Sequence, residues 1–407
     1  MVEIGNVFVT GLGPISSIGM GRTEFWSAIL RGQSGISRIE RFDTENFDSH
    51  VGGEIKNFDV KKYFSSAERN RYGRAAQYAI LATQLAIEDA GFGPEELRSK
   101  NVAVCLGTTM ADAPSIEAFD DDIATLGSCR GPTLRRRARQ YASCMIALQV
   151  AARFGIQGRV FMIPTACAAG NYAISYATDL ILAGKCDIAV AGGVDPLSRI
   201  AFSGFNRILA VAPEKCQPFD RNRRGMLIGE GAGILILESE RSVVMRGARP
   251  FARIAGRGAS CDAQHMTIPS VEGIASVMRK CLSNARRDPG EVDYVSAHGT
   301  GTQANDRAES AGILAVFGER GRQIPVSSIK SMLGHTMGAA SALEAIACAL
   351  AVHTDAVPPT INYETPDPEC PIDCVPNRAR KTKVKLALNN SFAFGGNNAS
   401  VLFEKIQ

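Results

Sequence analysis

The run Thr165-Ala166-Cys167-Ala168-Ala169-Gly170 joins a short strand-like lead, Ile163-Pro164-Thr165, to a helical pattern over residues 172–183. A cysteine just before a helix gains from the helix dipole and from free backbone N–H groups, which lower the pKa of its thiol. The same N–H groups can hold the oxyanion of a thioester intermediate. The run therefore indicates a nucleophilic Cys167, although a lone cysteine is more often a buried core residue.

Outward from this run, short β-rich apolar segments alternate with longer helical patterns. Strands are predicted at residues 102–106, 188–191 and 234–237, and helices at residues 78–90 and 172–183. Glycines follow both helical patterns, where C-terminal caps belong. This alternation predicts an α/β protein with mixed sheets covered by helices.

A weak internal repeat accompanies this pattern. Residues 7–13 and 252–258 are both strand-like segments that end in glycine. The pair suggests a duplicated fold, although two unrelated strand ends would look much the same. The junction is expected near Gly247-Ala248-Arg249-Pro250, which divides the chain into halves at residues 1–248 and 249–407.

Composition narrows the class of protein. The 407 residues are 45% hydrophobic and 21% charged, which fits a soluble globular protein, and a net charge of +4 gives no reason to expect nucleic-acid binding. No apolar run looks long enough to cross a bilayer, and the start of the chain lacks a signal-peptide layout, so a cytoplasmic protein is expected. Eleven cysteines without disulfide-framework spacing fit reduced thiols, and no metal site is expected at the closest pair, Cys370 and Cys374.

Two of the five histidines lie in glycine-flanked turns that follow strand-like runs. His298 lies in residues 295–302 and His335 in residues 327–336. A neutral imidazole can donate its Nε2–H to a carbonyl oxygen that gains enolate charge. A pair of such groups suits a reaction that stabilises a carbanion next to a thioester, so both histidines are candidate catalytic residues.

A lysine precedes the second of these histidines. Lys330 follows an apolar, strand-like segment, where an ammonium is costly to bury unless it is paired. Glu309 and Glu344 are its candidate partners, and Asp306 is placed to brace the His298 turn. Lys330 is therefore either a solvated lysine or a fixed charge that orders an active site.

Two glycine-rich runs are predicted to have different roles. In Phe392-Ala393-Phe394-Gly395-Gly396, the paired glycines allow unusual backbone conformations and the aromatic residue can act as a lid; a plain turn is the alternative. The run Gly229-Glu230-Gly231-Ala232-Gly233 lacks the lysine of a phosphate loop and precedes a strand. It is predicted to be a structural, hairpin-like element.

Together these motifs resemble those of the β-ketoacyl-acyl-carrier-protein synthases, in particular the elongating type with a Cys-His-His centre. The resemblance covers nearly the whole chain, and its ordered motifs are Pro218-Phe219-Asp220, residues 229–233, the His298 turn, residues 330–344 and the final Phe-x-Phe-Gly-Gly. It implies the thiolase fold, in which two similar α/β halves form a five-layer αβαβα sandwich. It also implies a dimer, with an acyl carrier protein as partner.

The resemblance assigns a role to each candidate residue. Cys167 would take the acyl chain from the carrier protein, and His298 and His335 would bind the malonyl thioester during decarboxylation. Lys330 would position and tune His335. Phe394 would gate the entrance, and its backbone N–H would form the oxyanion hole with that of Cys167. The implied reaction is a decarboxylative Claisen condensation in fatty-acid elongation, and it needs no metal or organic cofactor.

Further expectations concern the substrate path. Thr300 and Thr302 would contact the phosphopantetheine arm, and Met110 would border the acyl tunnel. Three positions depart from the usual pattern: Ala393 replaces a glycine, Met226 a phenylalanine and Asn397 a threonine. Because these changes surround the substrate path, an alternative function is the ketosynthase subunit of a specialised type II polyketide or polyene pathway. Such a subunit can form a heterodimer with a homologous, chain-length-factor-like partner.

Carrier proteins are usually acidic, so a local basic patch is expected. The candidate docking residues are Arg69, Arg71, Arg74 and Arg130. A second cluster, Arg135, Arg136, Arg137 and Arg139, stands where related enzymes usually have apolar residues. For each cluster, a solvent-exposed surface without a partner is an equally good interpretation. The second cluster could instead contact a partner subunit.

Two other functions are compatible with the same fold. A degradative thiolase needs a second cysteine in the C-terminal glycine loop, and residues 389–398 contain none. A non-catalytic chain-length factor lacks the active cysteine, whereas this chain has Cys167 and both histidines. An elongating ketosynthase is therefore the preferred function.

Overall fold

The computed structural model describes residues 5–56, 58–93, 95–127 and 131–406. Its centre is a continuous sheet in which two sets of strands are joined. The first set is β1 (Val7–Ser16), β5 (Val102–Gly107), β6 (Val160–Ile163), β7 (Ile188–Asp195) and β8 (Gly231–Ser239). The second set is β9 (Ala252–Cys261), β10 (Tyr294–Ser296), β11 (Val326–Ser327), β14 (Leu386–Phe392) and β15 (Asn397–Glu404).

The two sets share one strand order. The first runs β6-β5-β7-β8-β1 and the second runs β11-β10-β14-β15-β9. In each set the first three strands are parallel and the last two are antiparallel to their neighbours. Duplication of one α/β unit produces this arrangement. Strands β1 and β9 contain the repeated segments of the sequence, and they pair with each other at Phe8–Arg253 and Val9–Ala252.

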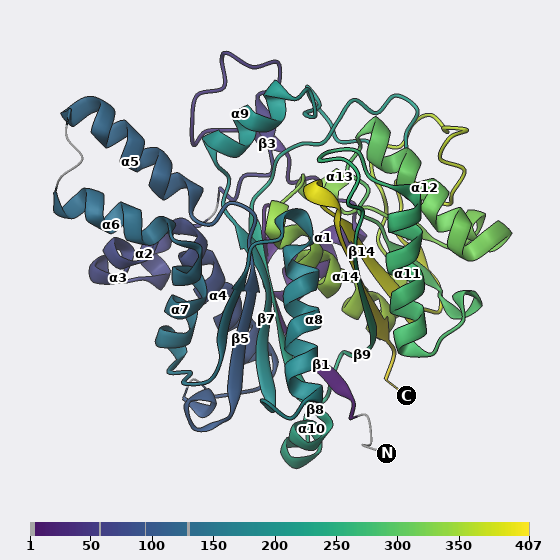
Figure 1. Cartoon of the computed structure of the whole chain (residues 1–407), viewed down its shortest axis with the longest axis horizontal. Coiled ribbons are helices and arrows are strands. Elements are labelled where there is room, and N and C mark those ends of the chain that lie inside the picture. Colours follow the sequence, from purple (N-terminus) through teal and green to yellow (C-terminus); the bar gives the residue numbers. More distant parts are fainter. Residues whose placement is uncertain (1–4, 57, 94, 128–130, 407) are drawn as a thin grey trace.

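Helices cover the sheet in layers (Figure 1). α4 (Arg74–Asp89) and α7 (Ser143–Phe154) pack outside the first set of strands, and α11 (Val271–Ala285) and α12 (Gln303–Phe317) lie outside the second. α8 (Ala169–Leu182) and α14 (Ala340–Thr354) lie between the two sets. The order is therefore helix, strand, helix, strand, helix, and the predicted α/β class with five layers is confirmed.

The central helix α14 shows why the layers form. Every residue from Ala340 to Val352 is buried, because the helix contacts both β8 and β14. A helix buried on all sides needs no polar face. Contrary to the sequence-based expectation, Met337–Thr354 is long and apolar enough to cross a membrane, but 89% of this segment is buried inside the structure. The segment is the core helix of the fold.

Glycines allow the central helices to touch their neighbours. A Cβ atom on Gly170 of α8 would lie 2.8 Å from the backbone nitrogen of Ala342 in α14. One on Gly107, at the end of β5, would lie 2.4 Å from the carbonyl carbon of Ala169. No side chain fits at either approach, so both positions require glycine. These contacts hold the first turn of α8, directly after Cys167, against β5 and α14.

The remaining elements surround this framework. The helices are α1 (Arg22–Leu30), α2 (Val60–Tyr63), α3 (Ser66–Arg71), α5 (Ala113–Leu126), α6 (Pro132–Tyr141), α9 (Arg199–Arg207), α10 (Glu240–Arg246) and α13 (Lys330–Leu333). The short strands are β2 (Gly19–Met20), β3 (Ser37–Arg38), β4 (Val51–Gly52), β12 (Ala356–Val357) and β13 (Arg380–Lys381). The 3-10 turns are η1 (Glu96–Ser99), η2 (Ala166–Ala168), η3 (Pro289–Glu291), η4 (Gly318–Arg322), η5 (Met337–Ala339) and η6 (Phe394–Gly396). Helices α5 and α6 project from the body near α2 and α3 (Figure 1).

The predicted elements fall where the sequence places them. The three predicted strands lie within β5, β7 and β8, and the two predicted helices coincide with α4 and α8 except at their ends. Gly91 and Gly184 follow these helices with φ values of +74° and +65°, as C-terminal caps do. The expected junction at residues 248–249 lies in the connection between α10 and β9.

Candidate active site

Cys167 lies at a sharp junction between β6 and α8. The chain leaves β6 at Ile163 and enters η2, where Ala166 adopts a φ of +48°. A residue other than glycine in this conformation is strained, and such strain is typical of functional sites. The carbonyl oxygen of Cys167 accepts a hydrogen bond of 3.0 Å from the Ser391 hydroxyl of β14. The nucleophile is thus held by both halves of the molecule.

Three side chains that are distant in the sequence converge at this junction. The sulfur of Cys167 and ring nitrogens of His298 and His335 all lie within 4.8 Å of one another, and all three residues are buried. The two imidazole rings are 5.4 Å apart, with an angle of 81° between their planes. His298 follows β10, and His335 lies between α13 and η5. The predicted Cys-His-His centre is therefore present.

Hydrogen bonds define the tautomer of each imidazole. Nδ1 of His335 accepts the N–H of Met337 at 3.1 Å, and Nδ1 of His298 lies 3.4 Å from the ammonium of Lys330. Both Nδ1 atoms therefore act as acceptors, which assigns the ring proton to Nε2. Each ring then presents an Nε2–H donor. Burial, followed by the charge of Lys330, lowers the pKa of both imidazoles well below the usual value, so both are neutral near pH 7.

Lys330 contacts His298 rather than His335, which corrects the expected pairing. Its ammonium donates to the carbonyl oxygen of His298 at 2.6 Å and to a carboxylate oxygen of Glu344. Lys330 and Glu344 are both buried. Burial raises the pKa of Glu344 to about 7, and the charge of Lys330 opposes this rise. Lys330 influences His335 only through its charge.

Two carboxylates fix the turn that carries His298. The oxygens of Glu309 accept the N–H groups of His298 and Gly299, each at 2.8 Å. Asp306 accepts the N–H of Gly301 at 3.2 Å and that of Phe219 at 2.8 Å. Glu309 is therefore a partner of the turn and not of Lys330, whereas Asp306 lies where the sequence placed it.

The backbone of His335 is held by Leu227 and Gly229, at the start of the glycine-rich run 229–233. The N–H of His335 donates to the carbonyl oxygen of Leu227 at 2.6 Å, and the N–H of Gly229 donates to the carbonyl oxygen of His335 at 2.9 Å. A Cβ atom on Gly229 would lie 2.4 Å from the carbonyl oxygen of Leu333. The run is structural, as predicted, but it is not a hairpin: Gly229 forms a parallel bridge to Gly53, and residues 231–233 begin β8. Ile228, just before the run, forms the parallel bridge to His335.

The prediction that the pKa of the Cys167 thiol is lowered is wrong, because burial outweighs the effect of the helix start. Burial raises the pKa of the thiol to about 12, and the positive charge of Lys330 opposes this effect only in part. The thiol is therefore protonated at rest. Its proton must leave as the sulfur attacks.

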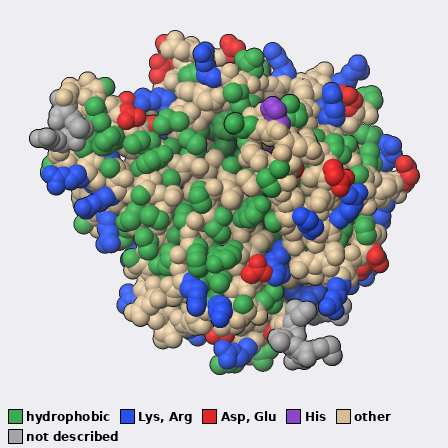
Figure 2. Space-filling model, in the orientation of Figure 1, with side chains coloured by type: hydrophobic (Ala, Val, Ile, Leu, Met, Phe, Trp, Pro, Cys, Tyr) green, Lys and Arg blue, Asp and Glu red, His purple; other side chains and the backbone are tan. Residues whose placement is uncertain are grey.

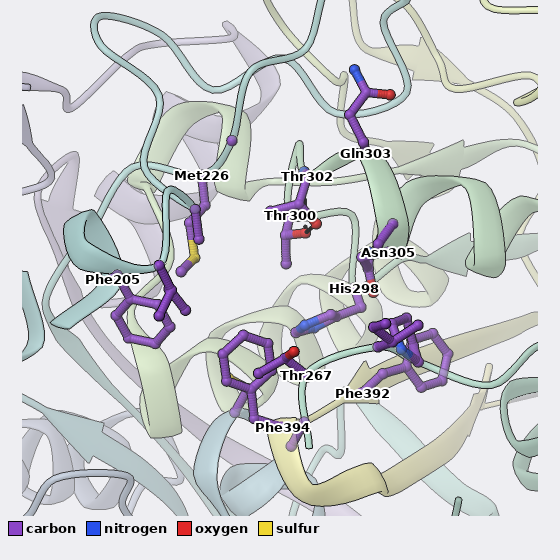
Figure 3. Close-up of a pocket in the computed structure, with 18 of the residues that line it drawn as sticks. Phe205, Met226, Thr267, His298, Thr300, Thr302, Gln303, Asn305, Phe392 and Phe394 are labelled. Carbon is purple, nitrogen blue, oxygen red and sulfur yellow. Dashed lines mark hydrogen bonds between the residues drawn. The ribbon is translucent and has the colours of Figure 1, made fainter. Parts of the chain in front are cut away.

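A cavity of about 400 Å³ leads from the surface to Cys167 and both histidines. His298 points into it, and the rings of Phe394 and Phe205 lie together at its side (Figure 3), 5.9 Å apart. Thr300 and Thr302 also line the cavity, and their hydroxyls are 2.9 Å apart. The cavity therefore joins the surface to the three reactive side chains and combines apolar walls with two hydroxyl groups.

The loop that carries Phe394 forms one wall of this cavity. Phe394 is 40% exposed, and Gly395 and Gly396 adopt φ values of +82° and +78°. Loop hydrogen bonds use the N–H groups of Ala393, Gly395 and Gly396. The N–H of Phe394 has no acceptor among the described residues and can receive a ligand. Ala393 is buried against Cys167.

Several predicted residues lie elsewhere. Met110 does not line this cavity, and its N–H donates to Asp195 at 3.1 Å. Arg130 lies outside the described residues. Arg69 and Arg71 lie in α3 and Arg74 begins α4, close to α6.

Sequence reasoning missed three features of the site. Phe205 at the end of α9 and the loop of residues 262–268 line the cavity, although no motif marks them. Asp195 binds the turn after His335 through the N–H of Gly338, at 2.6 Å. The signal for this contact in the sequence is the position of Asp195, an acidic residue at the end of the apolar strand β7.

The same three side chains contain the donor types of a metal site. A metal would need a thiolate and the lone pairs of imidazole nitrogens. Here the thiol pKa is raised, the Nδ1 lone pairs are engaged, and the Lys330 ammonium lies 3.4 Å from His298. A second positive charge is disfavoured there, so the arrangement suits acyl and enolate chemistry better than metal binding.

A duplicated five-layer fold with a buried Cys-His-His centre defines a condensing enzyme of the thiolase-fold class. Comparison with known proteins gives the family. The model of the beta-ketoacyl synthase N-terminal domain matches residues 5–242, and that of the C-terminal domain matches residues 251–364. The chain belongs to the beta-ketoacyl synthase family and is an acyltransferase.

Relatives of known sequence span the full length of the chain. Nodulation protein E of Rhizobium meliloti is 37% identical, over 98% of this chain and 99% of that protein. The 3-oxoacyl-[acyl-carrier-protein] synthase 2 of Staphylococcus aureus (strain COL) is 36% identical, over 100% of both chains.

Solved structures agree with these relatives. The ishigamide ketosynthase/chain length factor structure has a TM-score of 0.95 and 42% identity, covering 99% of this chain and 100% of that chain. A type II polyketide synthase acyl-carrier protein in complex with its ketosynthase, bound to the hexaketide, has a TM-score of 0.91 and 33% identity, covering 100% of each. The thiolase-like fold is thereby shown.

Proposed function

We propose that this enzyme condenses an acyl group on Cys167 with a malonyl group on an acyl carrier protein, which yields a β-ketoacyl carrier protein and CO2. The observation that carries the proposal is the approach of one thiol and two imidazoles to within 4.8 Å at the end of an open cavity. Neither a carbanion nor a tetrahedral oxyanion could be stabilised by the thiol alone.

The first step transfers the acyl chain. The Cys167 sulfur attacks the carbonyl carbon of the acyl carrier thioester, and the N–H groups of Cys167 and Phe394 hold the oxyanion. The bond from that carbon to the carrier sulfur breaks, and the departing thiolate takes up the proton that the Cys167 thiol gives up. The products are the acyl-Cys167 thioester and the free carrier thiol.

The second step makes the nucleophile. The bond between the malonyl carboxylate and the α-carbon breaks, CO2 leaves, and the electron pair spreads onto the thioester oxygen. The Nε2–H donors of His298 and His335 stabilise this enolate. The α-carbon then attacks the acyl carbonyl of Cys167. The carbon–sulfur bond breaks, and the Cys167 thiolate that leaves takes up one proton from the solvent.

The remaining site residues support this chemistry. Thr300 and Thr302 contact the phosphopantetheine arm, and Phe394 closes the entrance behind it. Lys330, paired with Glu344, holds His298, and burial together with the charge of Lys330 keeps both imidazoles neutral. The electron pair released by decarboxylation is consumed in the new carbon–carbon bond, so the reaction balances without a metal or an organic cofactor.

A specialised ketosynthase subunit is the second candidate. The 42% identity to the ishigamide ketosynthase/chain length factor structure favours it. A dimer is supported by the exposed apolar side chains Tyr141, Leu148 and Tyr176 of α6, α7 and α8. Figure 2 shows apolar side chains gathered over the face on which α7 and α8 lie in Figure 1. The edge strand β6 lies at the end of the sheet on that side. A homodimer serves fatty-acid elongation, and a heterodimer with a homologous subunit serves the specialised pathway.

The carrier protein is proposed to dock at a basic groove between α3, α4 and α6. Arg69, Arg74, Arg136 and Arg137 line one recess there, and Arg71, Arg135, Arg136 and Arg139 line the next. Residues of the two arginine clusters thus line recesses that share Arg136, and this basic surface complements an acidic partner. A cytoplasmic location fits this partner.

The test is mass spectrometry of the enzyme after incubation with acyl carrier protein. We expect Cys167 to gain one acyl mass, a Cys167→Ser variant to lose this labelling, and Cys144→Ser, which removes an exposed thiol, to keep it. Labelling of Cys167→Ser at the wild-type rate would overturn the proposal. Product analysis with malonyl carrier protein, with and without a co-expressed homologous subunit, separates the two pathways.

A further inference from the structure

The buried carboxylate of Asp195 accepts a full set of hydrogen bonds at the end of β7. Its Oδ1 atom accepts the hydroxyl of Thr108 at 2.7 Å and the N–H of Met110 at 3.1 Å. Its Oδ2 atom accepts the N–H of Thr109 at 2.7 Å and that of Gly338 at 2.6 Å. Asp195 therefore ties the end of β5 to η5.

The segment held through Gly338 is the turn that orients His335. Nδ1 of His335 accepts the N–H of Met337, the residue before Gly338. The turn also lies directly on β7, because a Cβ atom on Gly193 would be 2.1 Å from the carbonyl oxygen of Gly338. Movement of this turn would shift the His335 ring and remove the contact that fixes its tautomer.

The nucleophile is held by other contacts. Cys167 is fixed through the Ser391 hydroxyl and through the packing of Gly107 on Ala169. No hydrogen bond joins Asp195 to η2 among the residues that the structure describes. Different hydrogen bonds thus hold the thiol and His335, although η2 and η5 pack against each other. The charge of Asp195 raises the pKa of the Cys167 thiol, so removal of this charge does not by itself oppose acylation.

We propose that Asp195 is a positioning residue for His335, required for decarboxylation of the malonyl group but not for acylation of Cys167. This inference rests on the proposed function and adds a residue to it. A displacement of about 1 Å in a reacting group can cost roughly 100-fold in rate. Loss of the carboxylate leaves the N–H of Gly338 without its acceptor and frees the turn to move.

The test measures the two half-reactions separately in Asp195→Ala. CO2 release from malonyl carrier protein reports decarboxylation, and the mass of the Cys167 adduct reports acylation. We expect decarboxylation to fall by about 10- to 100-fold while acylation stays close to the wild-type rate. Equal loss in both half-reactions, or no loss in decarboxylation, would overturn the inference.

Glu238→Ala is the matched control. Glu238 is also a buried carboxylate: it accepts the hydroxyls of Thr10 at 2.5 Å and Ser242 at 2.7 Å and pairs with Arg246. Among the described residues, none of these partners lies in the His335 turn. This variant should lose stability without separating the half-reactions. If it separates them in the same way, the effect in Asp195→Ala is a general consequence of instability, and the inference fails.

A second variant keeps the inference testable if Asp195→Ala does not fold. In Gly338→Ala, the new Cβ atom would lie 2.7 Å from Oδ2 of Asp195 and 2.7 Å from Thr108, so the turn must move away. It should show the same selective loss of decarboxylation, and wild-type decarboxylation would contradict the inference. If the wild-type enzyme neither decarboxylates malonyl carrier protein nor takes up an acyl group, the proposed function itself fails.

Discussion

The ammonium of Lys330 lies 3.4 Å from Nδ1 of His298 and 2.6 Å from the carbonyl oxygen of the same residue. One side chain therefore fixes both the backbone and the ring of His298. The third contact of the ammonium, with Glu344, compensates its charge in a buried environment. Since Nδ1 faces a permanent donor, the reactive face of the imidazole carries the Nε2–H that an enolate requires.

Variants of Lys330 should distinguish its role in positioning His298 from its role in compensating the charge of Glu344. In Lys330→Met, Glu344 loses its partner, and breaking a buried pair costs about 3–5 kcal/mol of stability. In Lys330→Met/Glu344→Met an apolar pair replaces the ion pair, so stability should largely return. Decarboxylation should stay reduced by about 100-fold in both variants, because His298 has lost its donor. Denaturation curves and CO2 release give the two quantities, and recovery of activity in the double variant would refute the assignment.

The pH dependence follows from the lowered pKa of both imidazoles. A histidine with its usual pKa of about 6.5 would become protonated as the pH falls through that value. Here burial and the charge of Lys330 keep the rings neutral, so the rate of decarboxylation should stay level on the acid side of that value. In Lys330→Met one of the lowering causes is gone, so the acid limb of the pH–rate profile should move to higher pH. A wild-type limb centred near the usual histidine pKa would contradict this.

The same shift has a consequence for stability. Because the folded state holds His298 and His335 neutral, the unfolded chain binds more protons below its histidine pKa of about 6.5. Their contribution to stability is therefore present above that pH and is lost as the pH falls below it. Denaturation midpoints measured across this range in wild type and in His335→Gln should show a weaker acid dependence in the variant.

Ala393→Gly should loosen acyl-chain or extender selectivity. The methyl group of Ala393 is buried beside Cys167 and lines the cavity, and it narrows the backbone freedom of the loop that carries Phe394. Competition between unbranched and branched acyl carrier proteins measures the change. Ala399→Gly, in the same cluster but on β15, is the control and should leave the product distribution intact. An unchanged distribution and unchanged kinetics in Ala393→Gly would refute the prediction.

Gly170→Ala should destabilise the protein by about 1–3 kcal/mol, because overpacking at close contacts has this cost. The added Cβ atom would lie 2.8 Å from the backbone nitrogen of Ala342, where two buried helices cross. Gly204→Ala is the matched control: it lies in α9 with no atom within 4 Å of the new Cβ. It should be neutral or stabilising, by up to about 1 kcal/mol from helix propensity. Thermal denaturation of both variants makes the comparison, and equal stability would show that the helices can move apart.

Much of the fold and the centre of the site could be predicted from local signals. The alternation of strand and helix patterns gave the α/β class, and the repeat at residues 7–13 and 252–258 indicated the duplication that the shared strand order shows. Cys167 and the two histidines were identified because each lies beside glycine or other small residues in a turn that follows a strand-like run. Local patterns suffice for these features, because apolar periodicity and turn residues can be recognised within a short stretch of the chain.

Other relationships depend on distances that no local pattern encodes. Glu344 rather than Glu309 pairs with Lys330, and Lys330 contacts His298 rather than the nearer residue in sequence, His335. The thiol pKa also departs from the prediction, because desolvation by the surrounding fold outweighs the effect of the helix start.

The sequence by itself thus determined the class of fold and the nucleophile with its two histidines, since each of these depends on short-range order. Only the tertiary structure decided which carboxylate compensates which cation and which tautomer each imidazole adopts. It also decided that Asp195 holds the His335 turn and that residues of both arginine clusters line two recesses that share Arg136. Electrostatic interactions and burial act through space, so groups far apart along the chain set each other's protonation and position only after the halves have packed together.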